Sequence, residues 1–77
     1  MTPEQIKQFI EAGLSCEHVE VSGDGHHFEA VIVSAEFRGK SKVQQHQLVY
    51  RALGERMREE IHALSMQTCT PEDRARQ

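Results

Sequence analysis

Five histidines in a chain of 77 residues are the side chains best suited to do chemistry. Neutral imidazole is a common metal ligand, and it gains or loses its charge near neutral pH. His62 follows Ile61 at the expected junction of a helical segment and a strand, where the backbone is fixed while a side chain can stay accessible. The structural alternative is a helix-end histidine that interacts with the last carbonyls and the helix dipole. On spacing alone, that alternative is the stronger interpretation.

Two further histidines, His26 and His27, lie side by side in a predicted turn just before Phe28. A turn can expose a ligand, but polar residues that merely fill the turn explain the pair at least as well. His46 lies among glutamines on a predicted helix, and we expect it on the surface. His18 is expected to point outward from a strand.

No other set of residues forms a known catalytic pattern. The sequence has no nucleophile elbow, P-loop, H-E-x-x-H or dinucleotide fingerprint, so we expect no enzymatic activity. Cys16 and Cys69 are far apart and belong to no CxxC motif, which favours two separate reduced thiols. Glu59 and Glu60 are neighbours in sequence and do not face each other on a helix, so they are interpreted as solvated surface charges.

Positive charge gathers around the predicted second helix, beginning with Lys40 and Lys42. Such a helix, preceded by a glycine loop, could contact phosphates. The acidic residues Glu55, Glu59 and Glu60 dilute the stripe, and the formal net charge of the chain is −3. An ordinary charged helix face is therefore the better interpretation.

The first helix is predicted from its cap. Thr2, Pro3 and Gln5 stand in the order of a capping box with proline at the first helical position. Ile6 follows at the start of an apolar face, and Gly13 is a natural place for the helix to stop.

A β-hairpin is predicted next. Residues Glu17–Ser22 alternate between polar and apolar side chains, which indicates a half-buried strand. Gly23-Asp24-Gly25 has the composition of a turn. Phe28–Ser34 starts by alternating and ends apolar on both sides, which suits a strand in the centre of its sheet.

A second helix is expected after Ser41, a plausible N-cap. Gly54 is expected to split or bend it. The side chains predicted to form its buried stripe are Val43, Tyr50, Leu53, Met57 and Ile61. A third strand is predicted from the alternation of Leu64, Met66 and Thr68, and Thr70-Pro71 opens a short terminal helical turn.

The predicted order is α-β-β-α(α)-β, and the expected fold is a small α+β domain over residues 1–77, with a mixed sheet covered by helices on one face. A chain this short buries only about 60 % of its unfolded surface, which leaves little room for an enclosed active site. No segment approaches the length of a bilayer span, and no secretory signal is visible. We therefore expect a cytoplasmic protein without a membrane contact.

The residues from Phe37 to Pro71, read together, resemble the BolA family. The motifs that carry the resemblance are Phe37-x-Gly39-Lys40-Ser41-x-Val43-Gln44-x-His46-x-Leu48-Val49-Tyr50, then Ile61-His62-Ala63-Leu64-Ser65, then Thr68-x-Thr70-Pro71-Glu72. Upstream, His27-Phe28 and Val31-x-Val33-Ser34 fit as well. The resemblance covers nearly the whole chain.

The resemblance implies a fold similar to the class II K-homology arrangement and a partnership with monothiol glutaredoxins. In such complexes a [2Fe–2S] cluster is shared, with ligands from the glutaredoxin cysteine, glutathione and the BolA-like protein. The matching principal ligand is His62. The second is His26 or His27, of which His26 is preferred as the more loop-like. The chain alone is expected to be a monomer or weak homodimer that holds no cluster tightly.

The alternative that the resemblance implies is a DNA-binding transcriptional regulator. The matching surface would run from Arg38 through Lys40 and Lys42 along the second helix. Gln45 and Gln47 stand where the family often has arginine, which weakens phosphate contact. The chain also lacks the Gly-x-x-Gly loop with which ordinary K-homology domains clamp RNA, so the fold alone does not imply RNA binding.

Overall fold

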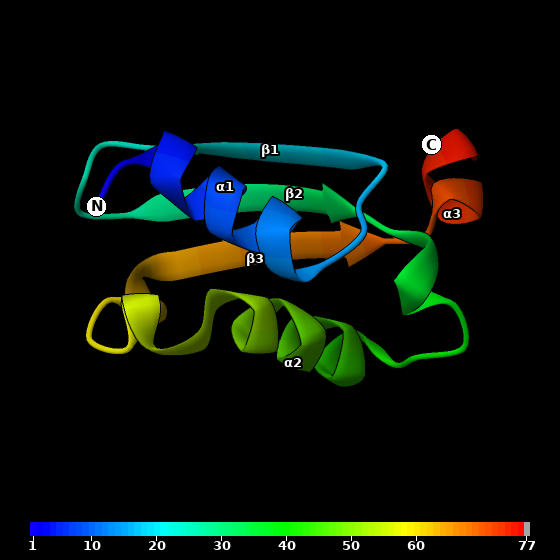
Figure 1. Cartoon of the computed structure of the whole chain (residues 1–77). Helices are drawn as coiled ribbons and strands as arrows, with labels where there is room; N and C mark the ends of the chain where they lie inside the picture. Colours follow the sequence, from blue (N-terminus) through cyan, green and yellow to red (C-terminus); the bar gives the residue numbers. More distant parts are fainter. Residues whose placement is uncertain (77) are drawn as a thin grey trace.

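A computed structural model describes residues 1–76, and its centre is a three-stranded sheet in the order β1-β2-β3 (Figure 1). The strands are β1 (His18–Gly23), β2 (Phe28–Val33) and β3 (Leu64–Cys69). β1 pairs with β2 antiparallel, and β2 pairs with β3 parallel. The predicted mixed sheet with the second strand in its centre is confirmed.

The helices lie mainly on one face of this sheet. α1 (Pro3–Gly13) and α2 (Lys42–Leu53) cover that face, whereas the short α3 (Pro71–Ala75) lies beyond the end of β3 (Figure 1). Three 3₁₀ turns complete the connections: η1 (Ala35–Phe37), η2 (Gly54–Met57) and η3 (Ile61–Ala63). The predicted α+β order is confirmed, including the terminal helical turn.

Each long helix begins with a complete capping box. The Thr2 hydroxyl accepts the Gln5 backbone N–H, and the Gln5 side chain in turn accepts the Thr2 backbone N–H. Ser41 and Gln44 repeat this exchange at the start of α2. These reciprocal bonds satisfy donors that a helix start otherwise leaves without partners, which is why both starts were predictable from local sequence.

Gly13 ends α1 for a different reason from the one predicted. It is not among the glycines with a positive φ, and the capping residue Leu14 is extended. Instead, a Cβ placed on Gly13 would lie 2.8 Å from the Cα of Ala52. The glycine is needed because the end of α1 packs directly against the backbone of α2.

Substituting Gly13→Val is expected to lower the free energy of unfolding by about 1–3 kcal/mol, because the added atoms meet α2 backbone that cannot yield cheaply. The measurement is urea denaturation. Ala12→Val introduces the same side chain at the neighbouring exposed position and should cost no more than about 0.7 kcal/mol, the loss of helix propensity from alanine to valine. Equal effects at the two positions would show that the helices do not meet closely at Gly13.

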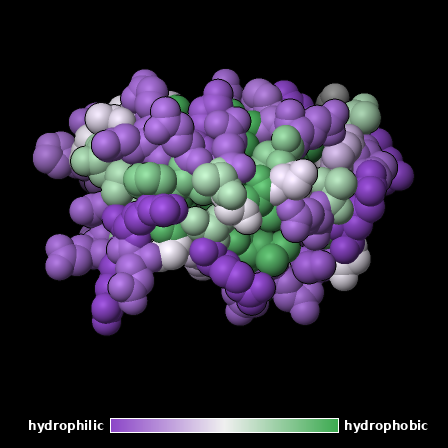
Figure 2. All heavy atoms as spheres, in the orientation of Figure 1, coloured by the Kyte–Doolittle hydropathy of each residue, from purple (hydrophilic) through white to green (hydrophobic). Residues whose placement is uncertain are grey.

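The core lies between the sheet and the two long helices. Phe37, which lies outside the predicted helices and strands, is fully buried in η1. The other buried apolar side chains of this core are Ile6, Ile10, Leu14, Val19, Phe28, Ala30, Ile32, Val49, Leu53, Met57 and Leu64. Hydrophobic residues that reach the surface on the helix side form a band across its middle, surrounded by hydrophilic residues (Figure 2).

The predicted buried stripe of α2 is partly wrong. Val43 and Tyr50 are 67% and 41% exposed, whereas Gln45 is only 5% exposed. Gln45 turns inward because its amide donates to the Lys40 carbonyl and accepts the Thr68 hydroxyl. A buried polar group with both partners present is tolerated, and hydrophobicity alone does not reveal it.

Two further predictions concern the end of α2. Gly54 does split the helical segment: it caps α2 with φ 61° and ψ −137°, and η2 begins there. Leu53 and Met57 are buried as predicted, while the side chain of Ile61 lies outside the described part of the chain.

None of the helices within residues 1–76 combines the length and the apolar composition that crossing a bilayer requires.

Candidate functional site

The parallel pairing of β2 with β3 brings three histidines to one end of the sheet. Phe28, the first residue of β2, lies opposite Leu64, the first residue of β3. His26 and His27 directly precede β2, and His62 lies two residues before β3. We call this region, defined by these three side chains, the histidine end. The turn and the start of β3 meet at the same side of the molecule in Figure 1.

The β1–β2 turn fixes the backbone of His26 and His27. The Asp24 carboxylate accepts the backbone N–H of His26 at 2.8 Å and that of His27 at 2.9 Å. The amides of His27 and then His26 hold the pKa of this carboxyl below its ordinary 3.8, because they stabilise its charged form. Both histidines are exposed, so their rings extend from an ordered turn. An aspartate before glycine in a turn was the sequence signal for this arrangement.

His62 is exposed in η3, which leads directly into β3. The Ala63 backbone N–H donates to the Glu60 carbonyl at 2.8 Å, and Leu64 is buried in the core. The backbone that follows His62 is thus fixed at Ala63 and Leu64, while the imidazole stays accessible. Because α2 already ends at Leu53, His62 does not lie at its last carbonyls and instead stands in the last turn of the short η3.

The histidine end is not a complete metal site by itself. Within residues 1–76, no three side chains of histidine, cysteine, aspartate or glutamate converge closely enough to hold a metal ion. The chain offers imidazole groups just before two neighbouring strands, and a metal held there would need further ligands from another molecule. This donor set fits half of a shared site.

The remaining histidines lie elsewhere. His18 is opposite Val33, so it lies at the far end of the sheet, with its ring 3.9 Å from the Glu20 carboxylate. Its side chain points away from the face that α1 and α2 cover, as predicted, because it alternates with buried Val19, and it is half-buried. His46 is also half-buried on α2 and is not the plain surface residue predicted from its glutamine neighbours.

Both cysteines are free, as predicted, and neither joins the histidine end. Cys16 precedes β1 and Cys69 ends β3, which places both at the far end of the sheet. Burial raises the pKa of the Cys16 thiol to about 11, with Glu11 and Glu36 adding to the shift. Cys16 is therefore protonated at neutral pH and is a poor nucleophile or metal ligand.

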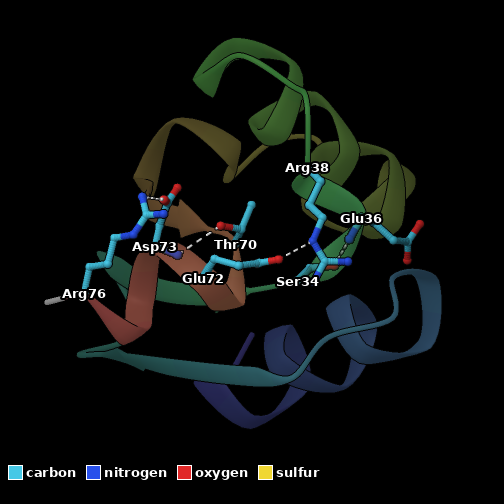
Figure 3. A network of polar contacts seen from close by, with 7 residues as sticks. All are labelled: Ser34, Glu36, Arg38, Thr70, Glu72, Asp73 and Arg76. Atoms are coloured by element: carbon cyan, nitrogen blue, oxygen red, sulfur yellow. Dashed lines mark hydrogen bonds and ion pairs between the residues drawn. The ribbon is translucent and has the colours of Figure 1, made fainter.

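The residues considered for nucleic-acid contact lie beyond the end of β2, away from the histidine end. Arg38 pairs with Glu72 of α3, as Figure 3 shows. The ammonium group of Lys42 donates to the Thr68 carbonyl on the outer edge of β3. Lys40 is exposed. Two of the three cations therefore already have intramolecular partners, which the sequence could not indicate.

The Arg38 guanidinium, hydrogen-bonded to Glu72, holds the pKa of that carboxyl below its ordinary 4.5. Because the folded-state pKa is lowered, the contact stabilises α3 above pH 4.5 and is lost as the pH falls through the lowered pKa. In an NMR titration, Arg38→Gln should move the Glu72 midpoint upward. Arg76→Gln, which removes a neighbouring arginine paired with Asp73, should leave that midpoint unchanged. An unchanged midpoint in Arg38→Gln would contradict the pairing.

Comparison with known proteins places these features in a family. The family model described as BolA-like protein matches residues 3–73. A solved structure of a BolA protein homologue from Coxiella burnetii is 49% identical, with a TM-score of 0.86 and 97% of each chain covered. The Escherichia coli acid stress protein IbaG is 39% identical over 77 residues, which cover 99% of this chain and 92% of the relative.

A third relative matches this chain over only part of its own length. The DNA-binding transcriptional regulator BolA of Haemophilus influenzae is 45% identical over 56 residues. The match covers 73% of this chain and 54% of the relative, so the chain spans about half the length of that protein.

Proposed function

The chain belongs to the BolA family, and from this premise we propose that it binds a monothiol glutaredoxin and shares a [2Fe–2S] cluster with it. The observation that carries the proposal is the histidine end, where exposed imidazoles just before two neighbouring strands form an incomplete donor set. A partner that supplies thiolates would complete it.

The residues present fit such a shared cluster. His62 extends from a backbone anchored in the core, and His26 or His27 extends from the turn that Asp24 holds. When bound, the cluster supplies an iron–sulfur centre that can exchange electrons or pass to another protein. Neutral imidazole in place of thiolate raises the potential of such centres. Imidazole ligation is lost on protonation, so we expect the shared cluster to become more labile at mildly acid pH.

The direct test is to mix the chain with a monothiol glutaredoxin, glutathione, ferrous iron and sulfide. The proposal predicts a heterodimer whose visible spectrum differs from that of the glutaredoxin cluster alone. A heterodimer that forms equally well without iron and sulfide, and leaves the spectrum unchanged, would instead show a plain interaction module whose histidines are incidental.

The name of the Haemophilus influenzae relative supports a second candidate, binding to duplex DNA. Lys40 is the exposed cation of the predicted surface, whereas Arg38 and Lys42 contact Glu72 and Thr68. Phosphate contact would have to compete with these intramolecular partners. The test is duplex binding at low salt, which should fall steeply as salt is raised if phosphates are contacted.

A further inference from the structure

The two edges of the sheet differ in how the chain covers them. The strand order is β1-β2-β3, so β1 and β3 are the edges. An edge strand presents backbone N–H and C=O groups that can pair with another strand. At the β3 edge the Lys42 ammonium group donates to the Thr68 carbonyl, and Thr68 is only 3% exposed. The β3 edge is therefore covered by the chain itself.

The β1 edge has no such cover. No helix or strand within residues 1–76 runs along the outer side of β1, whereas α2 runs beside β3 (Figure 1). Val21 is half-buried and Gly23 is exposed, so solvent reaches this edge. The six residues of β1 include neither proline nor lysine, which commonly protect an exposed edge. β1 is thus open to a further strand.

The backbone groups of Val21 and Gly23 point to the open side of β1. The Asp24 N–H donates to the His27 carbonyl at 3.2 Å, so this pair is hydrogen-bonded across the hairpin. In an antiparallel ladder, hydrogen-bonded pairs alternate with pairs that exchange no hydrogen bond. Gly23, opposite Phe28, therefore belongs to a pair of the second kind, and so does Val21. Their N–H and C=O groups remain free for another strand.

The charges on β1 select one register for a second copy of the same strand. A two-fold axis at Glu20 would place two glutamates opposite each other, and an axis at Ser22 would place Glu20 opposite Asp24. Like charges directly opposite each other destabilise a strand pair. An axis at Val21 instead places Glu20 opposite Ser22, whose hydroxyl can donate to the carboxylate. Symmetry repeats this favourable contact, so β1 is complementary to itself in that register.

We propose that two copies of this chain pair through β1 around a two-fold axis at Val21. The two Val21 backbones exchange N–H···O=C bonds, Val19 of one copy lies opposite Gly23 of the other, and the half-buried Val21 side chains pack together. The three strands of each copy then form one continuous sheet, whose outer edges are both β3. Because Lys42 covers each of these edges, the dimer is closed and does not extend into a fibre.

The inference goes beyond the proposed function and uses no residue of the histidine end. Its test contains the full chain without iron, sulfide or glutaredoxin, so its failure and that of the proposed function are distinguishable. A pair of edge strands buries less surface than a stable interface, so we expect a Kd of about 0.1–1 mM. Sedimentation equilibrium measures this association. In NMR spectra of the ¹⁵N-labelled chain, the Val21 amide should shift and exchange more slowly as concentration rises, whereas the Thr68 amide should not.

Substitution of Ser22 tests the register. Ser22→Glu places a like charge opposite Glu20 of the second copy twice, and should weaken the dimer about tenfold. Ser22→Lys places an opposite charge there and should strengthen the dimer. Ser65→Glu is the matched control, because Ser22 and Ser65 are both exposed and both in register with Glu29, but Ser65 lies on β3. It should dimerise like the unaltered chain.

Three results would overturn the proposal. The chain could stay monomeric at about 1 mM, the upper end of the expected range. Ser22→Glu could dimerise like Ser65→Glu, or Ser22→Lys could weaken the dimer as Ser22→Glu does. The concentration-dependent shifts could lie outside β1, which would assign the contact to another surface or partner segment. The fold of each variant is checked from its amide spectrum.

Discussion

Replacing His62 by alanine is expected to abolish or strongly weaken the cluster shared with a glutaredoxin. His62 is the exposed imidazole whose backbone is anchored next to the buried Leu64, and its sequence neighbours Ile61 and Ala63 carry no ligating side-chain atom that could replace it. Mutating a residue that only supports a metal ligand typically lowers metal affinity about 10–100-fold. Losing the ligand itself should therefore lower the affinity for the cluster at least about tenfold. The measurement is the rate of cluster loss, followed in the visible spectrum.

His18→Ala is the matched control for this experiment, because His18 is a partly exposed histidine at the opposite end of the same sheet. It should leave the spectrum and the rate of cluster loss unchanged. If His62→Ala behaves like His18→Ala, the assignment of His62 as a ligand is wrong. The glutaredoxin affinity of the metal-free chain should be the same for both variants, since neither removes a buried side chain.

The second ligand is decided by comparing His26→Ala with His27→Ala. Asp24 holds the backbone of both residues equally well, at 2.8 and 2.9 Å, so the turn does not distinguish them. We prefer His26, and expect His26→Ala to accelerate cluster loss more than His27→Ala does. The reverse order would assign the role to His27, and two silent variants would leave His62 as the chain's sole ligand.

The largest loss of stability is expected from Phe28→Ala. Phe28 is 2% exposed and lies between the histidine turn and the register partner Leu64. Removing a buried phenylalanine side chain costs about 3–5 kcal/mol, partly for the lost burial and partly for the cavity. That is a large share of the roughly 5–15 kcal/mol by which folded domains are stable. Chemical denaturation measures the change.

Phe37 provides the control, because it is equally buried but lies in η1, beyond the other end of β2. Phe37→Ala should be destabilising to a similar degree. The milder variants Phe28→Leu and Phe37→Leu, which stay folded, separate stability from function. Only Phe28→Leu should accelerate cluster loss, since Phe28 directly follows His27 and supports the turn. Equal acceleration by both variants would mean that the effect is one of general stability.

Local features of this chain could be predicted because neighbouring residues determine them. The capping boxes at Thr2 and Ser41 each need only a hydroxyl and an amide three residues apart. The hairpin follows from alternation on both sides of Gly23-Asp24-Gly25, and the terminal turn from Thr70 before Pro71. In each case the hydrogen-bond partners lie within a few residues of one another.

Contacts between distant segments could not be predicted in this way. Gln45 was not among the residues predicted to be buried, yet its partner Thr68, 23 positions away, makes its burial possible. Arg38 was considered as a phosphate contact, but it pairs with Glu72, 34 positions along the chain. Gly13 was explained by backbone freedom, whereas its close neighbour is Ala52.

The histidine end combines both kinds of information. The sequence by itself determined that His62 precedes a strand, that His26 and His27 occupy a turn, and that their setting resembles the BolA family. Only the tertiary structure decided the register of β3 against β2, with Phe28 opposite Leu64, which brings the turn and His62 to one end of the sheet. The physical reason is that strand pairing depends on burying the shared core beneath α1 and α2, a property of the whole chain that no local pattern contains.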